Sequence, residues 1–369
     1  MATKVREHVV EVPELPLPLS EVQQYGSIAG GRAARHLLIF AAFLPMLLAP
    51  VFLTVALVLQ GDPLAQRLLL QFNLAEAKVG FFGDSTVRAF SSCERDTDGI
   101  DDKLAAITGW PVTSLVSAGH TPRQWSVLAG LFAQTRNKPR IVIFPINLRS
   151  YSTGWGANPA WQFSAQKQYV RILSGDFTAI PQFVMDSVFT TSKAETAVMM
   201  NTEISAMGRH FGNMAEFAQR AKGVPLDLEC QDNQSPYQDA LKAKFILNYM
   251  HDIATDHPLL QSLKALADAL MKQDIRIAAY LVPVNVADGN ALVGPEFART
   301  IRRNKMIVTA VLEREQLPYV DLTEALSGKD FADKGCACEH LAAAGRQVVA
   351  RRIAKMLQSL APNIQDGAK

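Results

Sequence analysis

The chain is poor in cysteine and carries almost no excess charge. Its 369 residues include only four cysteines, which is too few for a disulfide scaffold. Lys and Arg (37) exceed Asp and Glu (35) by two, and this net charge of +2 gives no basic field with which to neutralise the phosphates of a nucleic acid. Internal repeats and low-complexity tracts are also missing. The composition, 49% hydrophobic and 20% charged, is that of a folded globular protein of one or two domains that does not bind nucleic acid.

One long hydrophobic run lies near the N-terminus. Leu37 to Leu59 contains no charged residue, and at about 1.5 Å per residue it is long enough to cross a hydrocarbon core of about 30 Å. We expect an uncleaved transmembrane helix, because the run is longer than the apolar part of a signal peptide and does not follow a short basic segment. A cleaved signal peptide and a buried core helix are the alternatives.

The charges beside this run predict its orientation. Arg32 and Arg35 lie directly before it, whereas only Arg67 follows it closely, so the positive-inside rule favours a cytoplasmic N-terminus. The expected parts are a cytoplasmic tail (1–36), a single-pass anchor (37–59) and an exported domain (60–369). In a Gram-negative bacterium the anchor lies in the inner membrane and the domain in the periplasm, where disulfides persist.

Within residues 60–369, short β-rich runs alternate with segments of helical periodicity. This alternation predicts an α/β fold in which a parallel sheet is covered by helices on both faces. Residues 150–237 interrupt the alternation without a clear strand, and we expect them to form a mostly helical insertion. The five predicted strands are Val79–Phe82, Val112–Val116, Arg140–Ile146, Ile275–Val282 and Tyr319–Leu322.

The first predicted strand runs directly into Gly83-Asp84-Ser85-Thr86. A serine at the carboxyl end of a strand lies where doubly wound folds bind their ligands, beside free backbone N–H groups of the following helix. This position suits a nucleophile whose reaction generates an oxyanion. The alternative is that Ser85 only caps the helix. The Gly-x-Ser-x-Gly turn of α/β-hydrolases is not met, because Val87 replaces its second glycine.

Four motifs follow one another between residues 79 and 359, each at the end of a predicted strand or before the last helix. They are Gly83-Asp84-Ser85, Gly119 in LVSAGHTP, Asn147 in IVIFPINLRS, and His340 in CACEHLAAAGRQVVARRI with Leu341 and Gly345 behind it. This ordered set resembles the SGNH (GDSL-like) hydrolase superfamily. The resemblance implies a flavodoxin-like doubly wound parallel sheet and a serine-dependent acyl-ester hydrolase or acyltransferase.

The chemistry of these residues agrees with the resemblance. His340 would be the base that activates Ser85. The backbone N–H groups of Ser85 and Gly119 and the side-chain amide of Asn147 would donate to the oxyanion. Each residue also has an ordinary alternative: Gly119 as a turn residue, Asn147 as a cap, and His340 as a histidine at a helix start.

One expected residue is missing. Members of the superfamily usually carry an aspartate three residues before the histidine, and Ala337 stands there instead. The acid that orients His340 is then Asp333 or Glu339, or it is absent. Glu339 directly precedes His340 and would normally point elsewhere, so we predict Asp333. Loss of the acid from a Ser-His-Asp triad can lower kcat by about 10⁴, which keeps a non-catalytic role open.

The remaining candidates near His340 are cysteines and a second histidine. Cys336 and Cys338 suggest zinc binding, but a metal on His340 would remove the base and no further ligand cluster supports it, so no metal site is expected. Cys93 follows the first strand, and a disulfide from it to Cys336 or Cys338 is the better interpretation. We expect His120 to be an ordinary solvated loop histidine.

Aromatic residues begin the insertion directly after Asn147. They are Tyr151, Trp155, Trp161 and Phe163. Flat apolar rings beside a catalytic site could stack on sugars or accept an acyl chain. The alternative is that they form the core of the insertion itself.

The resemblance also implies a class of substrate. Anchored proteins of this kind add or remove O-acetyl groups on an exopolysaccharide, such as cellulose or alginate, or on a cell-envelope glycan, often beside a membrane-bound acyltransferase or a polysaccharide synthase complex. No cofactor is expected. A non-catalytic binding or assembly subunit of such a complex is one alternative. It is favoured by Ala337, which replaces the expected aspartate. A lipid esterase is another, and it would need an apolar tunnel lined by the insertion.

Overall fold

The computed structural model describes residues 63–74, 76–90, 94–152, 155, 164–188, 238–332, 337 and 339–360. The predicted tail (1–36) and the predicted span Leu37–Leu59 lie outside these residues. Within the described ranges, no helix combines the length and the apolar character needed to cross a membrane.

Five strands and several helices alternate along the chain. The strands are β1 (Val79–Gly83), β2 (Val112–Val116), β3 (Ile141–Ile146), β4 (Arg276–Leu281) and β5 (Tyr319–Asp321). The α-helices are α2 (Pro63–Leu74), α3 (Ser85–Arg88), α4 (Ile100–Thr108), α5 (Pro122–Ala129), α7 (Ser164–Leu173), α8 (Ile180–Val188), α11 (Gln238–Tyr249), α12 (Pro258–Met271), α13 (Val286–Val293), α14 (Glu296–Arg314) and α15 (Ala343–Leu360). Short 3₁₀ helices are η1 (Gly130–Gln134), η2 (Leu148–Tyr151), η4 (Phe177–Ala179) and η7 (Gly328–Asp330).

The strands form one parallel sheet in the order β2-β1-β3-β4-β5. This is the flavodoxin-like order, in which the chain leaves β1 toward one edge and returns on its other side at β3. The predicted parallel α/β sheet is therefore confirmed, and each predicted strand agrees with the observed one to within two residues. The carboxyl ends of β1 and β3 lie at the point where the strand order reverses, which is where such sheets bind ligands.

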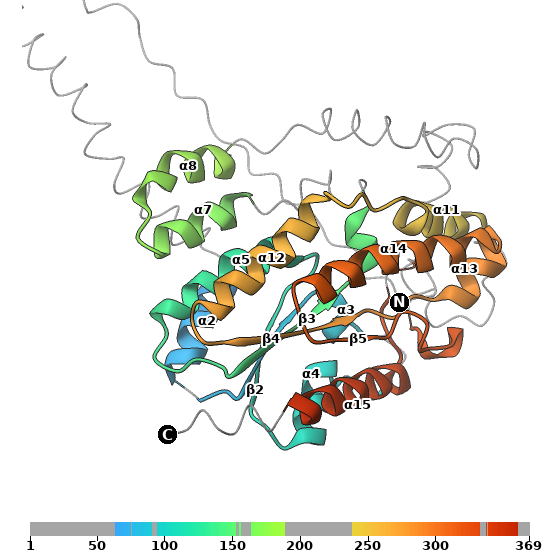
Figure 1. The fold of residues 1–369 in the computed structure, drawn as a ribbon, viewed down its shortest axis with the longest axis horizontal. Coiled ribbons are helices and arrows are strands. Elements are labelled where there is room, and N and C mark those ends of the chain that lie inside the picture. Colours follow the sequence, from blue (N-terminus) through green and yellow to red (C-terminus); the bar gives the residue numbers. More distant parts are fainter. Residues whose placement is uncertain are drawn as a thin grey trace, which may run out of the picture. The chain divides into compact units, whose positions relative to one another are not determined.

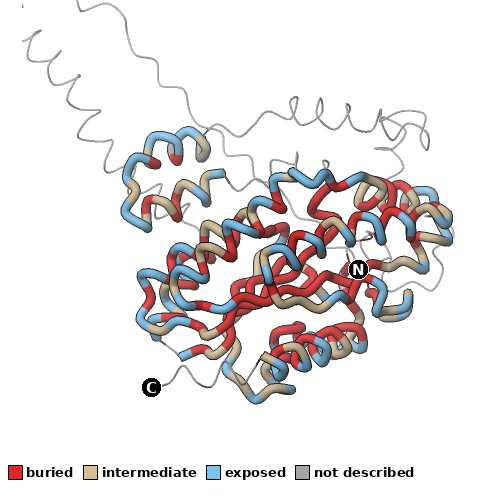
Figure 2. Tube along the Cα trace, in the orientation of Figure 1, coloured by how far each residue is buried: buried red, intermediate tan, exposed pale blue. Residues whose placement is uncertain are grey.

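Helices cover both faces of the sheet (Figure 1). The helices α4 and α15 pack together on one face, while α5, α12 and α14 lie on the other. The two central strands β1 and β3 are buried along their whole length (Figure 2), which explains their almost uninterrupted apolar sequences VGFFG and IVIFPI. The edge strands β2 and β5 are only partly buried.

Neighbouring residues of β1 pack in the cores on opposite faces of the sheet, because successive side chains of a strand point to opposite faces. Phe81 packs in the core shared by α4 and α15, near Tyr280 of β4. Phe82 lies on the other face, with ring centroids 6.3 Å from Trp125 and 6.1 Å from Phe132. Both faces of the sheet are thus closed by large apolar side chains, and the strand ends are held in a fixed arrangement.

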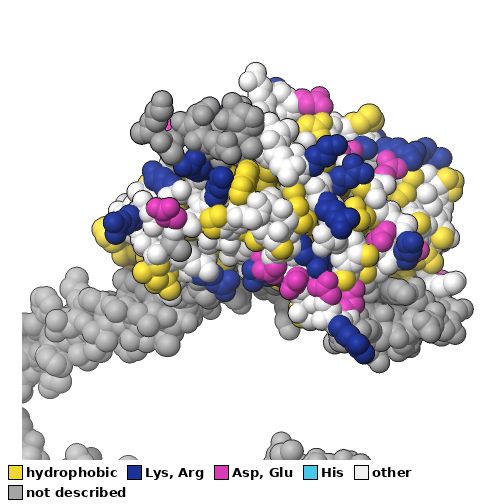
Figure 3. Space-filling view, turned by 90° about the horizontal axis from the view of Figure 1, so that it is seen from below, with side chains coloured by type: hydrophobic (Ala, Val, Ile, Leu, Met, Phe, Trp, Pro, Cys, Tyr) yellow, Lys and Arg dark blue, Asp and Glu magenta, His cyan; other side chains and the backbone are white. Residues whose placement is uncertain are grey.

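The predicted insertion (150–237) is described in part. Of this range the structure describes 150–152, 155 and 164–188, which contain η2, η4 and the helix pair α7 and α8. The rest of the range lies outside the described residues, so the helical insertion stays a prediction. On the face of the molecule shown in Figure 3, Lys and Arg side chains occur together with Asp and Glu and with hydrophobic side chains.

Candidate active site

Ser85 is the first residue of the short helix α3, directly behind β1. Its helix is capped by Asp84, whose Oδ1 accepts a hydrogen bond from the Thr86 N–H at 2.9 Å. The alternative that Ser85 serves only as the cap is therefore wrong. Gly83 lets α3 pack closely against the end of β1, because a Cβ there would lie 2.6 Å from a methyl group of Val87. The Ser85 hydroxyl is left free of any capping role.

His340 faces this serine across the end of the sheet. Its Nε2 lies 3.1 Å from the Ser85 Oγ, although the two residues are 255 positions apart in the chain. The backbone of His340 is fixed by an antiparallel bridge between Phe331 and Leu341, and the Ala332 N–H donates to the His340 carbonyl at 2.8 Å. A serine and a histidine at this distance have the geometry of a nucleophile and its base.

The electrostatic environment keeps His340 neutral. Burial, together with the positive charge of Arg149, lowers the pKa of His340 to about 4. A neutral imidazole can accept a proton from Ser85 throughout the neutral range. The same environment disfavours the imidazolium that proton transfer creates.

Gly119 and Asn147 follow β2 and β3 at the same edge of the sheet. Gly119 has φ of 75°, a left-handed conformation that glycine adopts without strain. The Oδ1 of Asn147 accepts from the Arg149 N–H at 3.0 Å and so caps η2, while its Nδ2 donates to Glu339 Oε2 at 3.2 Å. Asn147 is thus a cap, as the alternative had it, and its amide nitrogen is directed toward the residue beside His340.

Glu339 does not point away from the site, contrary to our prediction. Its side chain is buried, it hydrogen bonds to Asn147, and its Oε2 lies 3.3 Å from a guanidinium nitrogen of Arg149. The reason is its backbone, since φ is 60° at Glu339. In an extended chain adjacent side chains point to opposite sides, and this left-handed residue breaks that alternation.

Burial also changes the ionisation of Glu339. Loss of solvent raises the pKa of the Glu339 carboxyl to about 7, against the opposing effects of Arg149 and the Asn147 hydrogen bond. Asp84 adds to the increase in this pKa through charge repulsion. The carboxyl therefore changes its charge near neutral pH.

Asp333, predicted as the orienting acid, lies outside the described residues, so this role stays a prediction. Ala337, at the position of the expected aspartate, has φ of 52° and is held through its carbonyl by Asn248 Nδ2 at 3.0 Å. The segment that presents His340 is therefore fixed in part by backbone contacts.

Arg149 is a site residue that sequence reasoning missed. Its side chain is buried, its guanidinium pairs with Glu339, and the guanidinium carbon lies 4.5 Å from the centre of the Trp155 ring. Such contact with an aromatic face is a favourable position for a cation. A signal existed in the sequence, because an arginine two residues after the oxyanion candidate Asn147 lies at the same sheet edge.

The aromatic residues of the insertion separate into different environments. Tyr151 is buried and packs on His257 at the start of α12 with centroids 5.1 Å apart, so its contact is made outside the predicted insertion (150–237). Trp155 is half-buried beside Arg149. Trp161 and Phe163 lie outside the described residues, so their predicted contact with substrate stays a prediction.

His120 is not the solvated loop histidine that we expected. Its side chain is 2% exposed, and burial lowers its pKa to about 4. It follows Gly119 and directly precedes Thr121, which caps the start of α5. Within the described ranges, no group of His, Cys, Asp and Glu side chains could hold a metal ion.

A buried arginine ties the segment after β1 to the segment before α15. Arg346 of α15 donates to the Leu341 carbonyl at 2.6 Å, to the Asp98 carbonyl at 2.8 Å and to Glu94 Oε2 at 3.0 Å. Glu94 also accepts from the Ala343 N–H at 2.7 Å. We call these contacts the Arg346 clamp.

The clamp brings together the two segments between which a disulfide was predicted. Cys93, Cys336 and Cys338 themselves lie outside the described residues, so the bridge stays a prediction.

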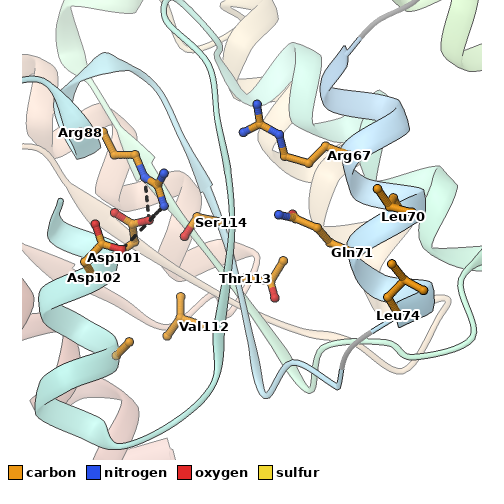
Figure 4. A pocket seen from close by; sticks show the side chains of 11 residues that line it. Arg67, Leu70, Gln71, Leu74, Arg88, Asp101, Asp102, Val112, Thr113 and Ser114 are labelled. Atoms are coloured by element: carbon orange, nitrogen blue, oxygen red, sulfur yellow. Dashed lines mark hydrogen bonds and ion pairs between the residues drawn. The ribbon is translucent and has the colours of Figure 1, made fainter. Parts of the chain in front are cut away.

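A cavity of about 400 Å³ lies apart from these residues, along the edge strand β2 between α2 and α4 (Figure 4). Arg88 reaches across from α3 and pairs with the buried Asp101 of α4, its Nε lying 2.9 Å from Oδ2. This pair anchors the helix that carries Ser85. Neither Ser85 nor His340 lines the cavity; its lining residues include Arg67, Leu70, Gln71, Leu74, Val112, Thr113 and Ser114.

No protein-family model and no curated protein sequence matches the chain. The solved structure of the native aryl esterase of M. smegmatis is similar over 78% of this chain and 100% of that chain, with 11% sequence identity and a TM-score of 0.32. A similarity at this TM-score is too low to assign an activity. The chemistry of the site therefore has to be judged from its own side chains.

Proposed function

We propose that this protein is a serine-dependent acyl esterase or O-acyltransferase. The observation that carries the proposal is the 3.1 Å contact between His340 Nε2 and Ser85 Oγ at the carboxyl edge of a flavodoxin-like sheet. In the proposed reaction His340 takes the Ser85 hydroxyl proton while Oγ bonds to the ester carbonyl carbon. The carbonyl oxygen then carries the negative charge, and the leaving alcohol receives the proton from His340.

The donors for that oxyanion are the N–H groups of Ser85 and Gly119 and the Asn147 amide. The N–H of Ser85 belongs to the first turn of α3, where backbone donors lack helical partners. Water or a sugar hydroxyl then takes the acyl group from Ser85. The first acceptor makes the protein an esterase and the second makes it a transferase.

The substrate and the location belong to the same proposal. A single-pass anchor at Leu37–Leu59 would hold the domain on the periplasmic side of a bacterial inner membrane, with the N-terminus in the cytoplasm. The substrate or acyl acceptor would be an exopolysaccharide such as cellulose or alginate, or a cell-envelope glycan, to which O-acetyl groups are added or from which they are removed. The motif resemblance and the charge distribution around the hydrophobic run support this part.

The test is the Ser85→Ala variant of the full chain, purified in detergent and given an acetyl-ester donor with and without oligosaccharide. We expect loss of acetate release and of acetylated sugar by mass spectrometry, with stability almost unchanged because Asp84 supplies the cap. Ser126→Ala is the control, since the Ser126 hydroxyl only donates to the Arg123 carbonyl on α5. Undiminished turnover in the Ser85 variant would remove this residue from the mechanism.

A non-catalytic subunit of a polysaccharide complex is the second candidate. The observation in its favour is Ala337 at the position of the expected aspartate, together with a histidine whose environment opposes protonation. Reaction of the wild-type protein with a fluorophosphonate probe separates the two candidates. Labelling at Ser85 supports the enzyme, and an unlabelled, folded protein supports the subunit.

A further inference from the structure

Three buried polar side chains form a connected group beside the proposed nucleophile and base. Glu339 contacts the Nδ2 of Asn147 at 3.2 Å and the guanidinium of Arg149 at 3.3 Å. The side chains of Arg149 and Glu339 are each 2% exposed. Removing two charges from water costs free energy unless they compensate each other closely. The proposed mechanism so far uses neither charge.

The reaction poses an electrostatic problem at this place. When His340 accepts the Ser85 proton it becomes a cation inside the protein, and Arg149 already opposes that charge. In a Ser-His-Asp triad the aspartate stabilises the imidazolium. Ala337 cannot do so. A negative charge beside Arg149 would offset that cation at the moment of proton transfer, whether or not Asp333 orients His340.

We propose that ionised Glu339 is a positioning residue that neutralises Arg149 and holds the Asn147 amide, and thereby allows His340 to accept the Ser85 proton. This inference rests on the proposed function. Glu339 acts through Arg149 and Asn147, so no direct contact with the substrate is needed. The backbone is left-handed at Ala337 and Glu339. In this arrangement the strained conformation places the Glu339 carboxylate inside the protein next to His340.

The charged groups that face Glu339 define its response to pH. Arg149 of η2 favours the carboxylate and Asp84 of the α3 cap opposes it, while His340 follows it in the chain. Burial sets the pKa of Glu339 at about 7, whereas the pKa of His340 is about 4. From pH 5.5 to pH 8 His340 is neutral throughout, and Glu339 gains its negative charge. An increase of the rate with pH across this range then reports Glu339.

The test compares Glu339→Gln with the wild-type full chain. Gln retains the size and hydrogen-bonding capacity of the protonated carboxyl but cannot ionise. We expect kcat/KM of the two proteins to converge near pH 5.5 and to differ by about tenfold or more at pH 8. A residue that only supports the loop would give the same ratio at every pH. The double variant Glu339→Gln with Arg149→Gln should recover part of the rate, since the opposing cation is also gone.

A surface ion pair provides the control. Glu324→Gln removes a carboxylate that lies 2.7 Å from Arg302 on the exposed side of α14, and its pH profile should match that of the wild type. A constant ratio between Glu339→Gln and the wild type across pH would overturn the inference.

A second measurement does not depend on turnover. In the wild-type protein the ¹³Cε1 resonance of His340, assigned with a His340→Gln variant, should show an inflection near pH 7 as Glu339 ionises. The inflection should vanish in Glu339→Gln and persist in Glu324→Gln. A wild-type resonance without it would overturn the coupling even if Ser85 proves to be the nucleophile. Loss of the coupling is thereby distinguished from failure of the proposed function, which the Ser85→Ala variant tests.

Discussion

Asp84 determines where the nucleophile lies, although it is not part of the proposed chemistry. Its Oδ1 accepts from both the N–H and the hydroxyl of Thr86, the latter at 2.5 Å. Because α3 is only four residues long, this cap accounts for much of the local order at Ser85. The serine is exposed to the site because a different residue satisfies the start of the helix.

We therefore expect Asp84→Ala to lower the free energy of unfolding by about 1–3 kcal/mol. The variant loses the cap and leaves the buried Thr86 hydroxyl without its acceptor. Asp84→Asn retains Oδ1 and should remain within about 0.5 kcal/mol of the wild type, because Asn and Asp are equivalent caps. Urea denaturation of both variants checks this. Equal losses in Asn and Ala would assign the effect to the charge of Asp84 instead of the cap.

At this scale the sequence predicted residue types better than residue environments. Ser85 was predicted from the end of the first strand and His340 from its motif before the last helix, and the two are brought together in the structure. The inward side chain of Glu339 could not be predicted, because it depends on a positive φ at a residue that is not glycine. The burial of His120 was also missed, since loop position alone does not determine exposure.

At the scale of elements, the Arg346 clamp joins the segment between α3 and α4 to the start of α15. Its guanidinium is fully buried and bonds to Glu94, to Leu341 and to the carbonyls of Asp96 and Asp98. Glu94, Asp96 and Asp98 lie on one segment and Leu341 lies on another, and no strand pairing connects the two segments. The clamp thus holds the segment that follows His340 against the segment that follows α3.

Arg346→Met should lower the free energy of unfolding by about 3–5 kcal/mol, because it leaves Glu94 and several carbonyls without their donor. The matched control is Arg351→Met on the exposed side of the same helix, for which we expect a change within about 0.5 kcal/mol. Denaturant titration followed by circular dichroism measures both. Similar stabilities for the two variants would show that the clamp contributes little.

Elements were predictable where the hydrophobic pattern was simple. The buried strands β1, β3 and β4 are apolar runs, and their limits followed within two residues. The start of α5 followed from Thr121-Pro122, which the structure shows as a capping box. The Arg346 clamp was not predictable, because it depends on tertiary contacts. The sequence of α15 showed only the spacing of apolar residues that is typical of a helix.

At the scale of the whole molecule, three histidines of the described residues, one buried and two partly buried, govern the response to acid. Burial lowers the pKa of His120, His251 and His340 from 6.5 to about 4 each. Between these values the unfolded chain binds more protons than the folded one, so stability falls as pH falls. Glu339 acts in the opposite sense, because its raised pKa gives stability that is present below about pH 4.5 and lost as pH rises toward 7.

The histidines outnumber this carboxyl, so we expect the melting temperature to fall steadily from pH 6.5 to pH 4. Each histidine accounts for up to about 3 kcal/mol at the acidic end. Differential scanning calorimetry across this range measures the trend, and His251→Asn should reduce its slope. A melting temperature that stays constant or rises toward pH 4 would contradict the expectation.

The separation of Ser85 and His340 by 255 residues also has a consequence in time. The serine directly follows the first strand of the sheet, and the histidine comes just before the last helix, α15. At about 5–20 residues per second, synthesis of the intervening chain takes tens of seconds. Throughout that interval the nascent chain carries a hydroxyl with no base beside it. In the proposed mechanism the growing polypeptide therefore cannot react with esters until its final helix has been made and packed.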